Sequence, residues 1–234
     1  NKGVPCDVQF TSAATHDSFM LAPSYYNHKD IVALDRAYIN YAKFEELTER
    51  GVVYVTKMKK NLKFEVLADY IYQDPQGLMQ DREQVVVFRK DGINHVARLI
   101  TYVDTQKAKS PKLVSLLTND FDMSLETIID IYRQRWQIEL LFKQIKQNFP
   151  LRYFYGESEN AIKIQIWVTL IANLLLSVLQ SSIERRWSFS GLATIVRIVL
   201  MYYLNLERFL NNPDADARNL LLEASESPPV NTEN

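Results

Sequence analysis

The stretch DIYRQRWQIELLFKQIK, from Asp130 to Lys146, carries more charged and aromatic residues than a purely structural helix needs. In a helix that turns about 100° per residue, Tyr132, Arg135, Glu139 and Lys146 fall at about 0°, −60°, −20° and −40°. They therefore share one stripe about 21 Å long, and Lys143 falls on the same stripe. One carboxylate set among a phenol and several cations is typical of a phosphate-handling surface with one metal ligand.

Ordinary ion pairing is the alternative interpretation of this stripe. Arg135 with Glu139, and Glu139 with Lys143, are also spaced as i,i+4 pairs, which stabilise an exposed helix by about 0.2 to 0.5 kcal/mol each. The choice between the two interpretations depends on whether a second carboxylate elsewhere in the chain completes a site.

Composition limits the class of protein. With 234 residues, 47% hydrophobic and 24% charged, the chain has the content of a soluble globular protein. A net charge of −1 excludes a strongly basic composition, so DNA binding must rest on local patches. One cysteine excludes an internal disulfide framework and fits a reducing cytoplasm. No secretory signal is visible, and the apolar run from Ile162 to Leu179 is expected to form a buried core helix rather than a membrane span.

The first part of the chain predicts a parallel α/β unit. A strand is expected at Val4–Phe10, and Asp17 would cap a short helix before Pro23. Then come a buried strand, a helix closed by Gly51 and a second buried strand, over residues 31–34, 41–50 and 52–57. Asp35 directly follows the first buried strand, at the end where functional residues collect in open α/β sheets. A cap on the following turn is the alternative role for Asp35, and position alone does not decide between the two.

A β-rich block follows, with strands expected over residues 64–72, 84–88, 96–102 and 113–117, separated by the turns DPQG, KDG and KAKSPK. Three helices are expected after it: over residues 124–148, over 160–186, and from near Ser190 to just before Asn211, the first capped by Ser124 and ended by Pro150. The division predicted by role is a core segment at 1–57, a β-rich insertion at 58–120, a helical part with the signature helix at 121–212, and an acidic, disordered tail at 213–234.

The spacing in the opening stretch resembles a known family. Tyr132, two residues, Arg135, three residues, Glu139, six residues and Lys146 match the Y-(2)-R-(3)-E-(6)-K signature of DDE transposases of the insertion-sequence-4 type. The segment DRAYINYAKFEEL, which begins at Asp35, resembles the segment of that family that holds the second aspartate. The resemblance extends over nearly all of the chain to about residue 210.

The resemblance implies an α/β fold with a partial ribonuclease-H-like core, a β-rich insertion and C-terminal helices. Three carboxylates in this family hold two divalent ions, normally Mg²⁺ with Mn²⁺ as the alternative, for in-line attack on a phosphodiester. Asp35 would be the second acidic ligand and Glu139 the third, both catalytic. Tyr132, Arg135 and Lys146 would contact DNA phosphates, with Lys143 beside them. Trp136 would stack on a displaced base or pack into the core.

The family's first aspartate and its N-terminal DNA-binding region find no match in this chain, which begins at Asn1. We therefore expect a truncated transposase that does not cleave DNA efficiently. The parent protein would be a cytoplasmic cut-and-paste enzyme that acts on terminal-repeat and target DNA as a homodimer, with no membrane partner. The alternatives are an inactive or domesticated relative that binds DNA, and a structural scaffold without a nucleic-acid partner. The sequence does not specify the terminal repeat.

Overall fold

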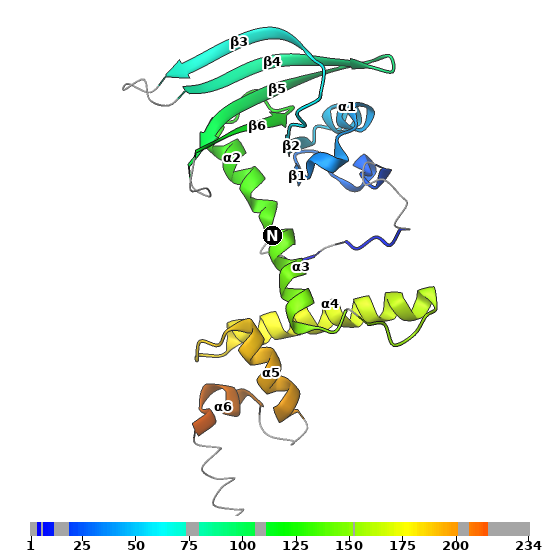
Figure 1. Cartoon of the computed structure of the whole chain (residues 1–234), viewed down its shortest axis with the longest axis vertical. Coiled ribbons are helices and arrows are strands. Elements are labelled where there is room, and N and C mark those ends of the chain that lie inside the picture. The colour runs from blue at the N-terminus through cyan, green and yellow to red at the C-terminus, as the bar shows by residue number, and fades with distance from the viewer. Residues whose placement is uncertain are drawn as a thin grey trace, which may run out of the picture. The chain divides into compact units, whose positions relative to one another are not determined.

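A mixed six-stranded sheet organises residues Gln9–Glu139 in the computed structural model of this chain (Figure 1). The structure describes residues 4–5, 7–11, 19–73, 80–105, 111–151, 153–200 and 206–214. Gln9–Glu139 form one compact unit, and Asn1–Val8 with Leu140–Asn234 form the other. The predicted α/β class is confirmed by the sheet and the helices together.

The sheet has the strand order β1-β2-β6-β5-β4-β3. Its strands are β1 (Ile31–Leu34), β2 (Val53–Lys57), β3 (Glu65–Gln73), β4 (Gln80–Lys90), β5 (Ile93–Asp104) and β6 (Lys112–Thr118). Strands β1 and β2 are parallel, with Leu34 opposite Thr56, and all other neighbours are antiparallel. Because β2 pairs directly with β6, the predicted β-rich block continues the sheet of the first α/β segment.

The parallel pair is connected by α1 (Tyr41–Glu49), as the sequence predicts. Asn40 caps the start of α1 by accepting a hydrogen bond from the Lys43 amide at 3.2 Å. After the helix, Gly51 takes a left-handed conformation with φ +67°, which costs a glycine little and releases the chain into β2. The predicted KDG turn is a tight β4–β5 hairpin with positive φ at Asp91 and Gly92.

Two helices cover opposite faces of the sheet. On one face, Phe44 and Leu47 of α1 pack with a cluster that includes Tyr54, Phe88 and Leu99. On the other face, Ile128 and Ile129 of α2 (Leu125–Gln134) pack against a cluster drawn from β2, β5 and β6. Consecutive strand residues point to opposite faces, so β2, β5 and β6 contribute to both clusters. The two clusters thus hold α1 and α2 against the sheet, and α2 contacts β1 and β2.

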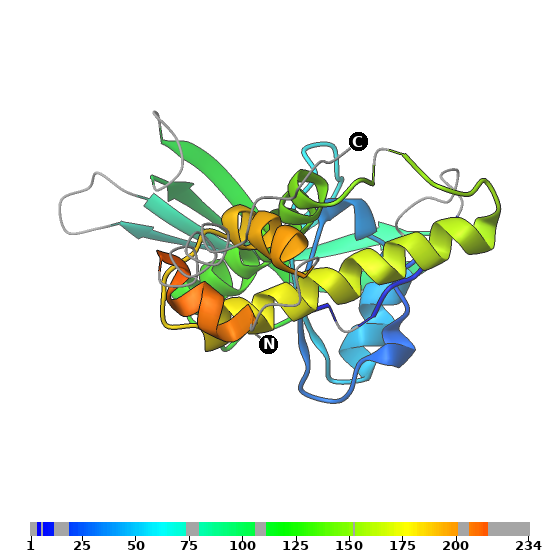
Figure 2. The ribbon, with the colours of Figure 1, turned by 90° about the horizontal axis from the view of Figure 1, so that it is seen from below.

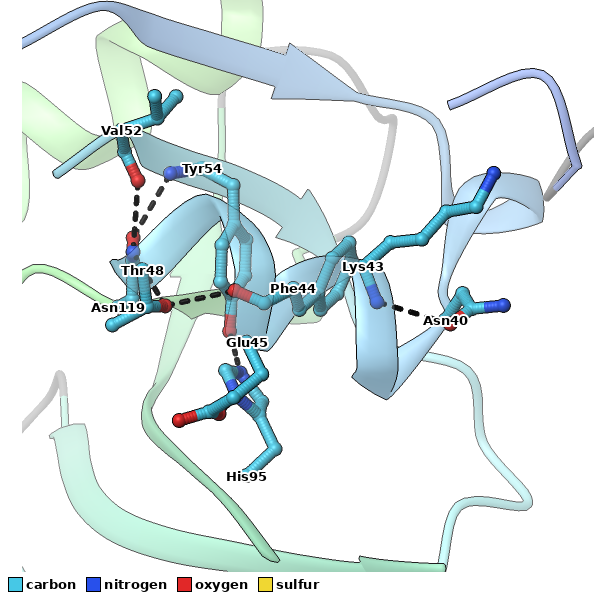
Figure 3. A network of polar contacts seen from close by, with 9 residues as sticks. All are labelled: Asn40, Lys43, Phe44, Glu45, Thr48, Val52, Tyr54, His95 and Asn119. Carbon is cyan, nitrogen blue, oxygen red and sulfur yellow. Dashed lines mark hydrogen bonds and ion pairs between the residues drawn. The ribbon is translucent and has the colours of Figure 1, made fainter. Parts of the chain in front are cut away.

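A buried polar network lies within the α1 face (Figure 3). The Tyr54 hydroxyl is 2.7 Å from Nε2 of His95, and Nδ1 of His95 is 2.6 Å from Glu45 of α1. Burial lowers the pKa of His95 despite the opposing effect of Glu45, so the imidazole is neutral near pH 7. Nδ1–H then donates to Glu45, and Nε2 accepts from the Tyr54 hydroxyl, whose pKa is raised by burial and by the charge of Glu45. The network ties α1 to β2 and β5.

The single helix predicted over residues 124–148 is wrong in one respect, because it is divided at Arg135. α2 ends at Gln134 and α3 (Trp136–Asn148) begins one residue beyond the break. At the junction the backbone tightens to three-residue hydrogen bonds, from the Arg135 amide to the Tyr132 carbonyl and from the Ile138 amide to the Arg135 carbonyl. The break falls at Arg135, whose side chain pairs with the carboxylates of Asp35 and Glu139. Ser124 caps α2 as predicted, accepting from the Thr127 amide at 3.3 Å.

In the second unit, α4 (Glu159–Ser182) is long and apolar, but the prediction that it is a buried core helix is wrong. The residues of α4 that the structure buries are Thr169 and Asn173, and Asn173 accepts a hydrogen bond from Gln144 at 2.9 Å. The reason is that polar residues recur every four positions along one side, and this side faces inward. Six apolar residues on the other side are 44 to 64% exposed: Ile164, Trp167, Val168, Ile171, Leu175 and Val178. By length and composition alone α4 could cross a membrane, which is weak evidence.

The C-terminal half of α4 packs with α5 (Phe189–Val199) and α6 (Leu206–Asn211), and Figure 2 shows α5 beside it. Their shared core contains Ile183, Leu192 and Leu210. The second predicted helix therefore ends at Ser182 rather than at residue 186. The third is described as α5 and α6, on either side of residues 201–205, which lie outside the described residues.

Three other predictions concern the ends of the chain and its division. The expected strand at residues 4–10 is not formed by the described residues of that segment; Pro5 within it lacks the amide donor that a strand ladder uses. The Asp17 cap, the DPQG turn and nearly all of the predicted disordered tail fall outside the described residues. Within the chain, the boundary between the two compact units falls after Glu139. The division by role into 1–57, 58–120, 121–212 and 213–234 stays a prediction.

Candidate functional site

Asp35 stands at the carboxyl end of β1, where η3 (Arg36–Tyr38) begins. Its Oδ1 accepts a hydrogen bond from the Ala37 amide at 3.0 Å, so it caps the turn, as one of the two interpretations predicted. Its other oxygen, Oδ2, is 3.3 Å from Nη1 of Arg135. The carboxylate side chain is 43% exposed. One oxygen therefore fixes the orientation of the group while the other faces the helix junction.

Glu139, in the first turn of α3, reaches the same guanidinium from the other side. Its Oε1 accepts a hydrogen bond from Nη2 of Arg135 at 2.7 Å. The expected i,i+4 ion pair is thus formed, and the structure adds Asp35 to it. Asp35 and Glu139 lie on either side of β2 to β6 in the sequence, and both carboxylates pair with Arg135.

Arg135 is the most constrained member of the cluster. Its side chain is 16% exposed, and its Nε is buried with no hydrogen-bond partner among the described residues. The Cζ atom lies 5.5 Å from the centroid of the Tyr132 ring, within the range of a cation–π contact. Burial alone would lower the pKa of Arg135, but the hydrogen bond to Glu139 and the surrounding charges raise it above its ordinary value. The guanidinium therefore carries its charge at every relevant pH.

Tyr132 is half-buried, and its ring lies against the guanidinium of Arg135. Burial raises the pKa of its phenol, Arg135 and Arg36 lower it, and Asp35 raises it, with a net upward shift. The phenol therefore stays protonated at neutral pH and can donate a hydrogen bond to an anion. Arg36 was not predicted as a site residue, although its place directly after Asp35 in the sequence was a usable signal.

The remaining predicted site residues lie along α3. Trp136 is 45% exposed, so it is not fully buried in the core, and its proposed stacking on a base stays a prediction. Lys143 and Lys146 are exposed and belong to the second compact unit. Their relation to Glu139 rests on helix spacing, since they follow it by four and seven residues on the same helix.

The donor chemistry of the cluster fits a divalent ion. Asp35 and Glu139 already direct hard oxygen atoms at one positive group. Mg²⁺ is commonly held by one or two protein carboxylates, with waters and substrate phosphates as the other ligands, so a pair is sufficient for one ion. Among the described residues, no group of three or more His, Cys, Asp or Glu side chains is placed to hold a metal. A third protein carboxylate is therefore not found in the part of the chain that the structure describes.

The chain is similar to known proteins. A family model described as the transposase DDE domain matches residues 1–175. The chain is 32% identical over 150 residues to a Synechocystis protein named as a transposase for insertion sequence element IS4SA, covering 64% of the chain and 41% of that protein. It is 26% identical over 203 residues to a Geobacillus stearothermophilus protein named as a transposase for insertion sequence element IS5377, covering 80% and 49%.

A third relative, from Sinorhizobium fredii and named as transposase y4zB, is 28% identical over 146 residues, which covers 62% of the chain and 41% of the relative. The chain thus spans less than half the length of these curated relatives. The family model, in contrast, matches most of the chain, including β1 to β6 and the helices that carry the cluster. The chain therefore belongs to the transposase DDE domain family.

Proposed function

We propose that the parent protein is a cut-and-paste transposase of the insertion-sequence-4 type, which cleaves and joins DNA at the ends of its own element. The observation that carries the proposal is the convergence of Asp35 and Glu139 on one cation at the carboxyl end of β1. In an open α/β sheet this edge is where catalytic residues collect. The described sheet and helices would be part of a ribonuclease-H-like core, acting in a bacterial cytoplasm without a membrane partner.

In this proposal Asp35 and Glu139 hold the metal, Mg²⁺ or Mn²⁺, of which the complete site would take two. Bound there, the metal lowers the pKa of a water or DNA hydroxyl nucleophile and neutralises charge on the leaving oxygen. Tyr132 and Arg135 bind the phosphate, the phenol as a hydrogen-bond donor and the guanidinium as a charged fork. Lys143 and Lys146 also contact DNA phosphates in this proposal, and Trp136 stacks on a displaced base. Two protomers would hold the two terminal repeats before joining them to target DNA.

DNA binding by this chain is the first test. We expect the affinity for a fluorescein-labelled duplex, measured by anisotropy, to fall linearly on a log–log plot against salt. Arg135→Ala should weaken binding because it removes a phosphate contact. Arg133→Ala is the matched control, since Arg133 neighbours it in sequence but pairs with Asp104 and Asp130. An affinity for the duplex that changes neither with salt concentration nor with Arg135→Ala would favour a structural scaffold without a nucleic-acid partner.

Strand cleavage is the second test, and it requires the full-length parent. With Mg²⁺ and DNA that carries the element's ends, Asp35→Asn and Glu139→Gln should each abolish nicking while duplex binding is retained. For the 234-residue chain alone we expect little cleavage, because two carboxylates do not complete the three-carboxylate site. Efficient Mg²⁺-dependent nicking by this chain, abolished by Glu139→Gln, would contradict that expectation and locate a complete site within it.

A second candidate function is an inactive or domesticated relative that binds DNA without cutting it. One observation favours it: among the described residues the cluster contains two carboxylates rather than three, and Arg135 already pairs with both of them. The two candidates separate on the full-length parent, which either nicks end DNA with Mg²⁺ or binds it without nicking.

A further inference from the structure

Arg135 takes up the same carboxylate oxygens that a metal ion would use. Its Nη1 is 3.3 Å from Oδ2 of Asp35, and its Nη2 is 2.7 Å from Oε1 of Glu139. Mg²⁺ coordinates oxygen atoms directly, at about 2.0 to 2.1 Å, so an ion held by these two oxygens would compete with the guanidinium nitrogens for them. Like charge further disfavours the two cations on the same pair of oxygens.

The guanidinium is also incompletely bonded where it is. It has five N–H donors in a planar fork, and the Nε–H is buried with no acceptor among the described residues. An unpaired buried donor is costly. A phosphodiester offers two oxygens that a fork of Nε–H and Nη–H binds together. Phosphate therefore provides an acceptor that neither Asp35 nor Glu139 supplies to this atom.

Removing Arg135 from the carboxylates without a replacement is unfavourable, because it leaves two like charges facing each other. The exchange is favourable when phosphate takes the arginine and a divalent ion takes the carboxylates. We propose that Arg135 is a displaceable counter-ion that blocks the metal site in the absence of DNA. Its transfer to a DNA phosphate couples DNA binding to metal binding. The inference rests on the proposed function, and it adds a regulation of the same site: the metal loads when DNA is present.

Metal affinity without DNA tests the blocking step. Mn²⁺ binding to the chain is titrated by the electron paramagnetic resonance signal of the free ion. Arg135→Gln should tighten Mn²⁺ binding by about five- to tenfold, the size that two partly exposed ion pairs supply. Arg133→Gln removes the same charge from the neighbouring helix turn and should change the affinity by less than about twofold, since it tests only general electrostatics. Glu139→Gln should remove the site.

The coupling step is tested by adding a short DNA duplex to the same titration. The duplex should tighten Mn²⁺ binding to the wild-type chain by about the factor that Arg135→Gln produces. The duplex should add little in the Arg135→Gln variant, which has no arginine to transfer. By reciprocity, Mn²⁺ should tighten duplex binding by the same factor in the wild type.

A second variant and a second signal guard against misfolding. Arg135→Lys keeps a positive charge but loses the fork, and it should give an intermediate affinity for Mn²⁺. In the wild type, the 15N–1H resonance of Nε of Arg135 should shift when Mg²⁺ and duplex are added together, and much less with either alone. A resonance that does not move under any of these conditions would show a fixed structural pair and overturn the proposal.

The outcomes separate this inference from the proposed function. Glu139-dependent Mn²⁺ binding that is equal in the wild type and Arg135→Gln, or equally tightened by Arg133→Gln, would overturn the counter-ion role and leave the metal site intact. Absence of Glu139-dependent Mn²⁺ binding in every variant would overturn the metal site itself, and the inference with it.

Discussion

The Tyr54 hydroxyl offers a sharp test of how α1 is held on the sheet. Tyr54→Phe removes one oxygen atom and leaves the ring stacked on Phe44, whose centroid is 4.1 Å away. The Nε2 atom of His95 then has no hydrogen-bond donor, and water does not replace it, because His95 is only 1% exposed. An unsatisfied buried acceptor costs about 1 to 3 kcal/mol, so we expect the free energy of unfolding of this unit to fall by about 2 kcal/mol.

Replacing both partners should cost less than the sum of the single changes. In the double variant Tyr54→Phe with His95→Phe, no buried polar atom of the pair is left unpaired, and Glu45 is 39% exposed and can turn to water. When both partners of a hydrogen bond become apolar the net cost can be small. The double-mutant cycle should therefore give a favourable interaction energy of at least about 1 kcal/mol between the two groups.

The same histidine makes stability depend on pH. Burial lowers the pKa of His95 in the folded chain, so between the folded and unfolded pKa values the unfolded state is protonated while the folded state is neutral. Stability is then complete above the unfolded pKa of about 6.5 and is lost as pH falls from there toward the folded pKa. The loss is at most about 1.4 kcal/mol per pH unit for one site, and it should be absent from the double variant.

Hydrogen exchange of the amides in β2 and β5, followed by mass spectrometry at increasing urea, measures opening of this sheet separately from the helical unit. It should be run at pH 7.5 and 5.5, with the rates corrected for intrinsic exchange. An opening free energy within about 0.5 kcal/mol of wild type for Tyr54→Phe would refute the reasoning, because buried groups of this kind cost more. Additive single changes would refute it equally.

Three further predictions concern other parts of the chain. Gly51→Ala should lower the free energy of unfolding by about 1 to 2 kcal/mol in urea melts, because φ is +67° there and the new Cβ would lie 2.1 Å from Nδ1 of His28. The Asn119 side chain accepts a hydrogen bond from the Tyr54 amide and donates to the Val52 carbonyl and the Thr48 hydroxyl. Asn119→Ala removes these bonds and should lower the opening free energy by about 2 kcal/mol in the same hydrogen-exchange assay. Lys146→Ala should reduce the slope of log Kd against log salt for duplex DNA by about 1, and an unchanged slope would exclude a phosphate contact; Lys163→Ala, which loses an ion pair to Glu159, is the matched control.

The local features of this protein followed from the sequence, because they depend on residues a few positions apart. The four-residue spacing of Arg135 and Glu139 predicts their pairing, and the structure forms it at 2.7 Å. Gly51 and the KDG turn likewise predicted the end of α1 and the β4–β5 hairpin, and both are formed. The position of Asp35 directly after a strand was visible for the same reason, but the predicted burial of that whole strand is wrong, because Ile31 is exposed and Leu34 is its buried residue.

The tertiary structure alone decided which distant groups meet. Nothing near Asp35 in sequence indicates that its second oxygen faces Arg135; that contact follows from α2 packing on the sheet through Ile128 and Ile129. The pairing of β2 with β6, which merges the two predicted blocks into one sheet, and the inward polar side of α4 are of the same kind. Hydrophobic periodicity shows that a face is buried or exposed, but not which partner covers it. The sequence thus predicted a charged helix and a strand-end carboxylate, and packing made Arg135 the common partner of both carboxylates.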